Sequence, residues 1–342
     1  MANNLQKPKR GWIITALFLS LGGLLFVYFF SGSENGLELL LEVQPSYLIA
    51  AFLFVVICWL LDALRLKVAL NITGENLSLS NLFVNSLATA FMAGITPLAA
   101  GGPPAQIYFF YRQGIDLEKG FSVSTVRMLL NFIFFVVVTP IALILFYQAL
   151  ELEGFMSIII LIAVLLMAGG IAAFLYFLYR PELVEKAAFW LLRRRFLGEN
   201  IRNNALKWAK NVHDQVLRFN ICLKMLVLSG QKLRLFLLAL LTVFYWLIFF
   251  SIALLLIRGL GYQTPPLITV MRQVVYYFLI NYVPLPGASG VAEIGFAATF
   301  SSLLPKSILT PFVILWRLFT YYTNLLFGGF AFWYVSRKTG IS

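Results

Sequence analysis

The sequence is poor in charged residues. Only 12% of its 342 residues are Asp, Glu, Lys or Arg, whereas 61% are hydrophobic and the mean hydropathy is +0.88. Soluble domains carry about 25% charged and 45–50% apolar residues, so this composition excludes an ordinary soluble enzyme. The apolar runs are long and continuous, unlike the short alternating segments of a membrane β-barrel. The composition therefore predicts an all-α polytopic membrane protein.

Residues that build metal centres and disulfides are also scarce. The chain has one histidine, His213, and two cysteines, Cys58 in an apolar run and Cys222 in a basic one. One histidine argues against a histidine-based metal or catalytic cluster within one chain, and two cysteines in such different settings indicate no disulfide framework. We therefore predict no metal, no cofactor and no catalytic residue.

The net charge of +12 would suggest a nucleic-acid partner in a soluble protein. In a membrane protein, basic residues instead gather in cytoplasmic loops and face anionic lipid, so no specific nucleic acid is expected. Residues 180–234 contain twelve basic and four acidic residues, with apolar side chains at helical spacing in their second half. We interpret them as a basic cytoplasmic amphipathic segment on the inner leaflet.

Long apolar runs predict about six spanning helices, since about 20 residues cross the hydrocarbon core. They cover residues 12–30, 47–70, 121–147, 155–179, 235–257 and 312–335. Basic residues flank the first and last runs, which predicts that both termini are cytoplasmic. The expected location is the cytoplasmic membrane of a bacterial cell, crossed several times.

Two Pro- and Gly-rich stretches interrupt the remaining apolar sequence. Proline removes a backbone donor and glycine loosens the backbone, so neither stretch continues a regular helix. Broken backbone at membrane depth is tolerated only inside protein or beside a wet cavity. We predict two re-entrant helix pairs, residues 81–112 and 265–304; the alternative is that both are ordinary full spans. The residues that make the breaks are Pro97, Gly101, Gly102, Pro104, Pro284, Pro286, Gly287 and Gly290.

The two breaks belong to a repeat within a single domain, residues 1–342. In each copy a Pro-Leu pair is followed, nine residues after the proline, by Gln106 or Glu293. Residues 47–147 and 235–336 then have matching elements of opposite predicted orientation, an inverted repeat of the kind found in transporters. Helices starting near Pro103 and near Ser289 would present N-termini suited to phosphate or carboxylate.

Polar side chains inside the predicted membrane region are the candidate substrate-binding residues, because ionisable groups there are costly. We expect the arginines to neutralise a lipid phosphate and the carboxylates to pair with a cationic headgroup or with the arginines. Asp62 and Arg65 could instead be only a structural i,i+3 pair, and Arg127 could extend to the interface. The candidates are Asp62, Arg65, Gln106, Arg127, Asn131, Glu293 and Arg317.

Other residues of the second copy are assigned less specific roles. Arg272 is expected near the outer entrance as a headgroup contact. Aromatic residues at such positions commonly form an interfacial belt. That is the expectation for Tyr276, Tyr277, Trp316, Tyr321 and Tyr322.

These motifs, taken together, resemble the lysylphosphatidylglycerol synthase transmembrane region, also called the flippase-like domain family. The resemblance covers essentially the whole chain. Pro103 departs from it, since many members have Glu or Gly there, and no carboxylate role is carried over to that position. The matching residues are Thr96, Pro97, Gly101, Gly102, Pro104, Ala105, Gln106, Arg127, Pro284, Pro286, Gly287, Gly290, Glu293 and Arg317.

The resemblance implies a phospholipid flippase, often serving lysylphosphatidylglycerol and thereby resistance to cationic antimicrobial peptides. Bifunctional members carry a soluble aminoacyltransferase domain after the membrane part, and no such domain is expected here. Two alternatives stay open: a phosphatidylglycerol lysyltransferase or its membrane subunit, and an ion or solute transporter. The expected partners are membrane phospholipids, with a second copy of the chain and a separate aminoacyltransferase as candidate protein partners.

Overall fold

The computed structural model describes residues 18, 21–29, 38–150, 154–179 and 230–338, and it is helical almost throughout. The predicted amphipathic segment lies outside these residues up to position 229. The first half contains α2 (Pro45–Ile72), α3 (Leu79–Gly94), α4 (Gly102–Arg112), α5 (Leu117–Leu150) and α6 (Gly154–Tyr179). The second contains α9 (Lys232–Gly259), α10 (Pro266–Ile280), α11 (Val291–Phe300), α12 (Lys306–Arg317), the π-helix η3 (Leu318–Tyr322) and α13 (Thr323–Lys338).

The helix ends follow from local sequence. Proline occupies the first turn of α2, α4 and α10, where its missing N–H costs nothing. The Ser78 hydroxyl accepts the Asn81 N–H at 3.3 Å and caps α3. Gly74, Gly114 and Gly261 adopt positive φ just after α2, α4 and α9, which lets the chain leave each helix.

Three helices are long and apolar enough to cross a membrane among the described residues: α2, residues 117–146 of α5, and α9. The chain is thus an integral membrane protein, as its composition predicted. The predicted span 312–335 is not one continuous α-helix, because the π-helix separates α12 from α13. Helix α9 also begins at Lys232, three residues before the predicted start of its span.

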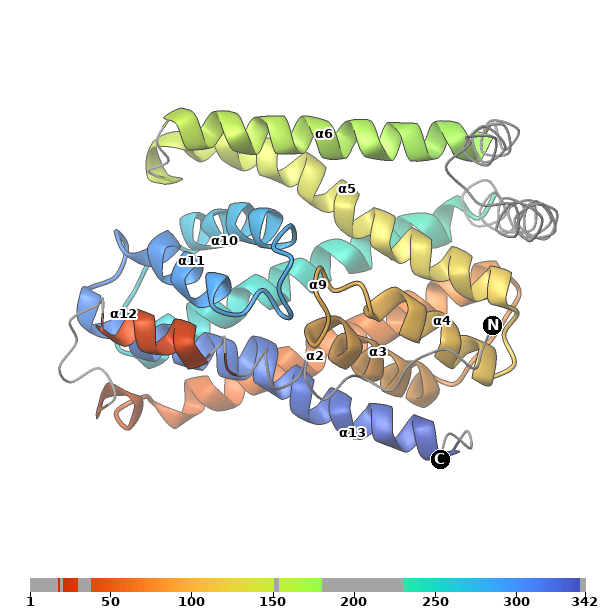
Figure 1. Cartoon of the computed structure of the whole chain (residues 1–342), viewed down its shortest axis with the longest axis horizontal. Coiled ribbons are helices and arrows are strands. Elements are labelled where there is room, and N and C mark those ends of the chain that lie inside the picture. The colour runs from red at the N-terminus through yellow and green to blue at the C-terminus, as the bar shows by residue number, and fades with distance from the viewer. Residues whose placement is uncertain (1–17, 19–20, 30–37, 151–153, 180–229, 339–342) are drawn as a thin grey trace, which may run out of the picture.

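The two broken segments form short helix pairs, α3 with α4 and α10 with α11. The pairs point toward each other from opposite ends of the molecule, and their turns meet at its centre (Figure 1). Helix α3 packs on α13 of the second half, whereas α10 packs on α5 of the first half, so each pair contacts a helix of the other half. Helices α2 and α9 lie against each other and join the halves.

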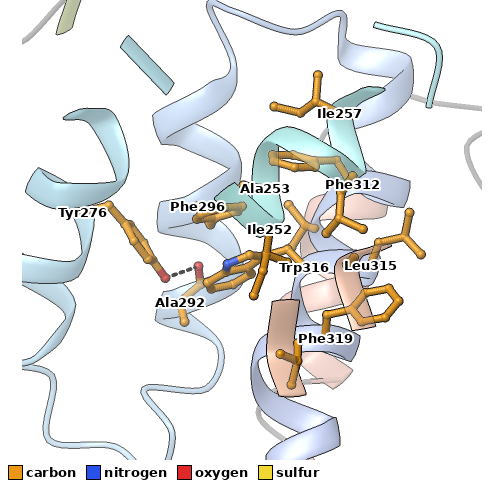
Figure 2. Packing of buried hydrophobic residues seen from close by; sticks show 14 of the residues in the cluster. Ile252, Ala253, Ile257, Tyr276, Ala292, Phe296, Phe312, Leu315, Trp316 and Phe319 are labelled. Atoms are coloured by element: carbon orange, nitrogen blue, oxygen red, sulfur yellow. Dashed lines mark hydrogen bonds between the residues drawn. The ribbon is translucent and has the colours of Figure 1, made fainter. Parts of the chain in front are cut away.

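An aromatic core holds α11 against α12. The rings of Phe296 and Trp316 stack with centroids 3.8 Å apart, and Phe312 lies beside Phe296 at 5.3 Å (Figure 2). Ile252 and Ala253 of α9 close this cluster from another side. Burial of large aromatic side chains is a strong source of stability. The core therefore fixes the end of α12, where Arg317 directly follows Trp316.

Candidate functional site

The two breaks touch each other. Pro97 and Pro286 form an isolated antiparallel bridge, the only pairing of extended backbone among the described residues. Tyr321 also donates to the Gly94 carbonyl at 3.2 Å, so residues more than 180 positions apart in sequence meet at one point. The breaks and the π-helix therefore form one junction at the centre of the protein.

The backbone has the same form in both breaks. The next helix begins five residues after each bridged proline, at Gly102 and at Val291. Between them, Leu98 and Ala99 have φ of +54°, and the corresponding Gly287 and Ala288 have +58° and +50°. Left-handed backbone is strained for residues with a Cβ, and such strain clusters at functional sites.

This geometry corrects the register predicted from the repeated Pro-Leu pair. Glu293 is the third residue of α11, and the third residue of α4 is Pro104. Gln106 is the fifth residue of α4 and so corresponds to Gly295, not to Glu293. The Pro-Leu pairs do not mark equivalent positions, because the turn conformation and the helix start set the register.

The residue before each helix needs an acceptor for its N–H, and the two breaks supply different ones. In the first break, the Thr96 hydroxyl accepts from Gly101 N at 2.8 Å. In the second, Glu293 Oε2 accepts from Gly290 N at 2.7 Å, as the acidic member of a capping box does. The second helix was predicted to start near Ser289, and its N-cap is the next residue, Gly290.

The capping carboxylate also forms a buried ion pair. Arg317 Nε donates to Glu293 Oε1 at 2.8 Å, and Arg317 Nη2 donates to the Gly287 carbonyl at 3.3 Å. The Glu293 side chain is fully buried and that of Arg317 is 5% exposed. Such a pair is weak evidence for stability, but losing either partner is costly. The ring of Tyr321 lies 4.8 Å from the guanidinium carbon.

A cavity of about 260 Å³ opens at this junction. Its walls include both turns, with Leu98 and Ala99 from one and Gly287 and Ala288 from the other, and Arg317. Gly287 has no alternative here, because a Cβ would lie 2.5 Å from the Tyr321 ring. Glu293 and the Gly287 carbonyl hold Nε and Nη2 of Arg317, and the side chain of Arg317 lines this cavity.

Most of the aromatic residues expected at the interface are found here instead. Tyr276, Tyr277, Trp316 and Tyr321 line the cavity. Tyr276 is fixed by its hydroxyl, which donates to the Ala292 carbonyl at 2.9 Å (Figure 2). Sequence spacing alone could not distinguish a belt from a cavity wall, because both place aromatic residues beside polar surroundings.

A second polar cluster lies among α2, α3 and α5. Asp62 contacts Arg127 Nη2 at 3.0 Å and Arg65 Nη1 at 3.5 Å, and it also accepts from the Ser86 hydroxyl. Arg65 Nη2 donates to Asn131 Oδ1 at 2.9 Å. Four predicted site residues thus meet in one network, with two arginines and one carboxylate. Arg127 is the most accessible of the three charged members, with a side chain 23% exposed.

Two predicted residues fall outside both networks. Gln106 is buried, and its Nε2 has no hydrogen-bond partner among the described residues. Arg272 was expected as a headgroup contact, but it is buried and donates to the Thr299 carbonyl at 2.8 Å and to the Ser302 hydroxyl at 2.7 Å. A cation there stabilises the C-terminus of α11.

Sequence analysis missed a glycine beside the ion pair. Gly23, in the helical residues 21–29, approaches α11 so closely that a Cβ would lie 2.8 Å from Gly290 Cα and 3.1 Å from Glu293 Oε2. The neighbouring Gly22 has open space at that position. The only signal in the sequence is the Gly-Gly pair itself, which does not reveal its distant contact.

Known proteins are similar in sequence to this chain over much of its length. A family model described as the lysylphosphatidylglycerol synthase TM region matches residues 13–328. A UPF0104 membrane protein of Archaeoglobus fulgidus is 30% identical over 319 residues, covering 92% of this chain and 94% of the relative. A UPF0104 membrane protein of Methanothermobacter thermautotrophicus is 26% identical over 214 residues, 60% of each chain.

Proposed function

The chain belongs to the family of the lysylphosphatidylglycerol synthase transmembrane region, and on this basis we propose that it moves a phospholipid between membrane leaflets. Lysylphosphatidylglycerol is the proposed substrate. The observation that carries the proposal is the central cavity, where two helix breaks meet beside a buried arginine. Exposure of a lysyl lipid on the outer leaflet would add positive charge and so contribute to resistance to cationic antimicrobial peptides.

The short helices support a re-entrant arrangement. Helices α3 and α10 have 16 and 15 residues, and α4 and α11 have 11 and 10. At 1.5 Å per residue none exceeds about 24 Å, which is less than the roughly 30 Å of the hydrocarbon core. In our proposal each pair enters from one membrane face and turns back at the centre. The halves 47–147 and 235–336 then form an inverted repeat around the cavity.

The cavity has chemistry for a charged headgroup. A phosphate would accept from Arg317 Nη1 and lie near the N-terminus of α11, where helix N–H groups favour anions. The ammonium groups of a lysyl headgroup would face the surrounding rings of Tyr276, Tyr277 and Tyr321, as cations do in aromatic sites. The headgroup would cross through this polar region while the hydrocarbon chains stay in lipid.

The second polar cluster, around Asp62, supplies another contact in this scheme. Its two arginines exceed its one carboxylate, and the partly exposed Arg127 is the group that a phosphate could reach. Arg127 and Arg317 would then bind the headgroup at successive positions along the path. Glu293 and Asp62 would hold these arginines in place when no lipid is bound.

Translocation in vesicles of defined composition tests the proposal. The purified full chain would be reconstituted with a panel of labelled lipids, including phosphatidylglycerol and lysylphosphatidylglycerol. We expect movement of at least one of them above protein-free vesicles, and its loss in Arg317→Ala. If no lipid in the panel moves, or if Arg317→Ala and Arg127→Ala both leave movement unchanged, the proposed site is wrong.

The family description includes the word synthase, and this favours one competing function. A phosphatidylglycerol lysyltransferase, or its membrane subunit working with a separate aminoacyltransferase, would make lysyl lipid from charged tRNA. Lysyl-lipid synthesis by the purified chain would support it. An ion or solute transporter would instead move its substrate in vesicles without moving lipid. A location in the cytoplasmic membrane with both termini inside, and a homodimer, belong to the same proposal.

A further inference from the structure

A second cavity lies between α5 and α6, and the proposed headgroup site does not use it. Its volume is about 570 Å³, within the range of ligand-binding pockets. No charged side chain lines it among the described residues. Apolar side chains of the two helices form its walls, with Asn281 and Tyr282 of the second break at one end.

The groove exists because α5 and α6 diverge. The helices are close where they join and separate toward the other end of α6 (Figure 1). Near the join, Phe135 and Ala142 of α5 pack with Ile160 and Val164 of α6 in one buried cluster. Beyond that cluster, the groove follows one stripe of α6 at helical spacing, from Ala163 through Leu166, Met167 and Gly170 to Ile171.

The groove and the central cavity share a wall residue. Asn281 lines both, and its Nδ2 donates to the Tyr277 carbonyl at 2.8 Å. Tyr282 follows it with an exposed ring, an amphipathic side chain of the kind found between apolar and polar surroundings. A compartment lined by a cationic side chain, Arg317, is therefore adjacent to an apolar compartment with no charged lining residue among the described residues.

We propose that this groove binds one hydrocarbon chain of the phospholipid whose phosphate lies beside Arg317. The inference rests on the proposed function. A phospholipid has the same arrangement as the two compartments, with a charged headgroup joined directly to apolar chains. Bound this way, the lipid gains affinity from van der Waals contact between its chain and the groove walls, because a hydrocarbon chain already lies in apolar surroundings in the bilayer. The groove would thus select lipids by chain as well as by headgroup.

Two adjacent glycines of α6 provide a matched pair of variants. A Cβ added to either Gly169 or Gly170 meets no atom within 4 Å, so both positions accept a larger side chain. Gly170 lines the groove, whereas Gly169 lies off the groove stripe. Gly170→Trp would fill the groove, and Gly169→Trp would add the same bulk outside it.

The test measures binding of two phosphatidylglycerol probes to the purified full chain in detergent, one with two oleoyl chains and one with two hexanoyl chains. We expect Gly170→Trp to weaken dioleoyl binding about tenfold and to leave dihexanoyl binding within about twofold, since the short chains reach little of the groove. Gly169→Trp should change neither. Gly170→Ala and Gly170→Leu should give graded losses, which a general folding defect would not.

The outcomes separate this inference from the proposed headgroup site. Arg317→Ala should weaken both probes, and if it weakens neither the headgroup assignment fails while the groove can still be judged from Gly170→Trp. If Gly170→Trp leaves dioleoyl binding unchanged, the groove holds only bulk lipid and the inference is overturned. Equal losses for both probes, or for both tryptophan variants, would overturn it as well.

Discussion

The two helix breaks have the same backbone form and different chemistry. In each, a bridged proline is followed by two left-handed residues and a helix that begins five residues later. The first break satisfies its N-cap N–H with the neutral Thr96, and the second uses the charged Glu293. The same backbone conformation thus has a neutral cap in the first break and a charged one in the second.

The comparison extends to the arginines. Arg317 pairs with a carboxylate on the break helix itself and reaches the central cavity. Arg127, in α5, pairs with Asp62 of α2. The carboxylate has therefore changed helices between the halves. The two arginines can take their carboxylates from different helices, because ion pairing depends on distance and not on which helix supplies the partner.

The largest effect is expected at the charged break. Glu293→Gln keeps an acceptor for the Gly290 N–H but leaves Arg317 buried without its counter-charge. Breaking such a pair costs about 3–5 kcal/mol, so the melting temperature in detergent should fall steeply and lipid translocation should drop more than tenfold. The exposed Glu38→Gln is the control. Wild-type melting and translocation in Glu293→Gln would show that the two breaks are equivalent after all.

The next largest effect is expected where the helical residues 21–29 approach α11 of the second break. Gly23→Leu should destabilise the protein by about 1–3 kcal/mol, because its side chain would press on the N-terminus of α11. Gly22→Leu, one residue away with open space, should have no comparable effect. Thermal unfolding of the two purified variants measures the difference, and equal melting temperatures would exclude the contact.

A conservative change of each arginine compares the two clusters directly. Arg317→Lys should lower lipid translocation about tenfold, because one ammonium cannot hold both Glu293 and the Gly287 carbonyl. Arg127→Lys should lower it less than about threefold, since Arg127 pairs with Asp62 alone among the described residues and is partly exposed. The readout is the ratio of the translocation rates of the two variants in matched proteoliposomes. A larger loss in Arg127→Lys than in Arg317→Lys would move the main site to the second polar cluster, around Asp62.

The smallest effect is expected at the neutral break. Thr96→Val removes the acceptor for Gly101 N and should cost about 1 kcal/mol, the usual value of one buried hydrogen bond. Thr96→Ser should recover most of it. Hydrogen exchange at Gly101 and thermal unfolding would detect the change. A loss as large as that of Glu293→Gln would contradict the distinction between a neutral support and an ionic site.

Much of the site could be predicted from residue type and location. Asp62, Arg65, Arg127 and Asn131 meet in one network, and Glu293 meets Arg317, because a charge inside an apolar helix must find a partner. The partners themselves were less predictable. Gln106 was matched to Glu293 by a repeated dipeptide, whereas backbone conformation sets the true register.

The sequence by itself determined that this is a helical membrane protein of one family, where its helices break, and which charges lie in apolar surroundings. Composition indicates the membrane class, and proline placement indicates where helices break. Neither depends on how the helices pack. Only the tertiary structure decided that the breaks touch, that Tyr276 and Tyr321 line a cavity, and that Gly23 lies against Glu293. Those contacts join residues far apart in the chain, and they depend on how the helices pack and not on any local pattern.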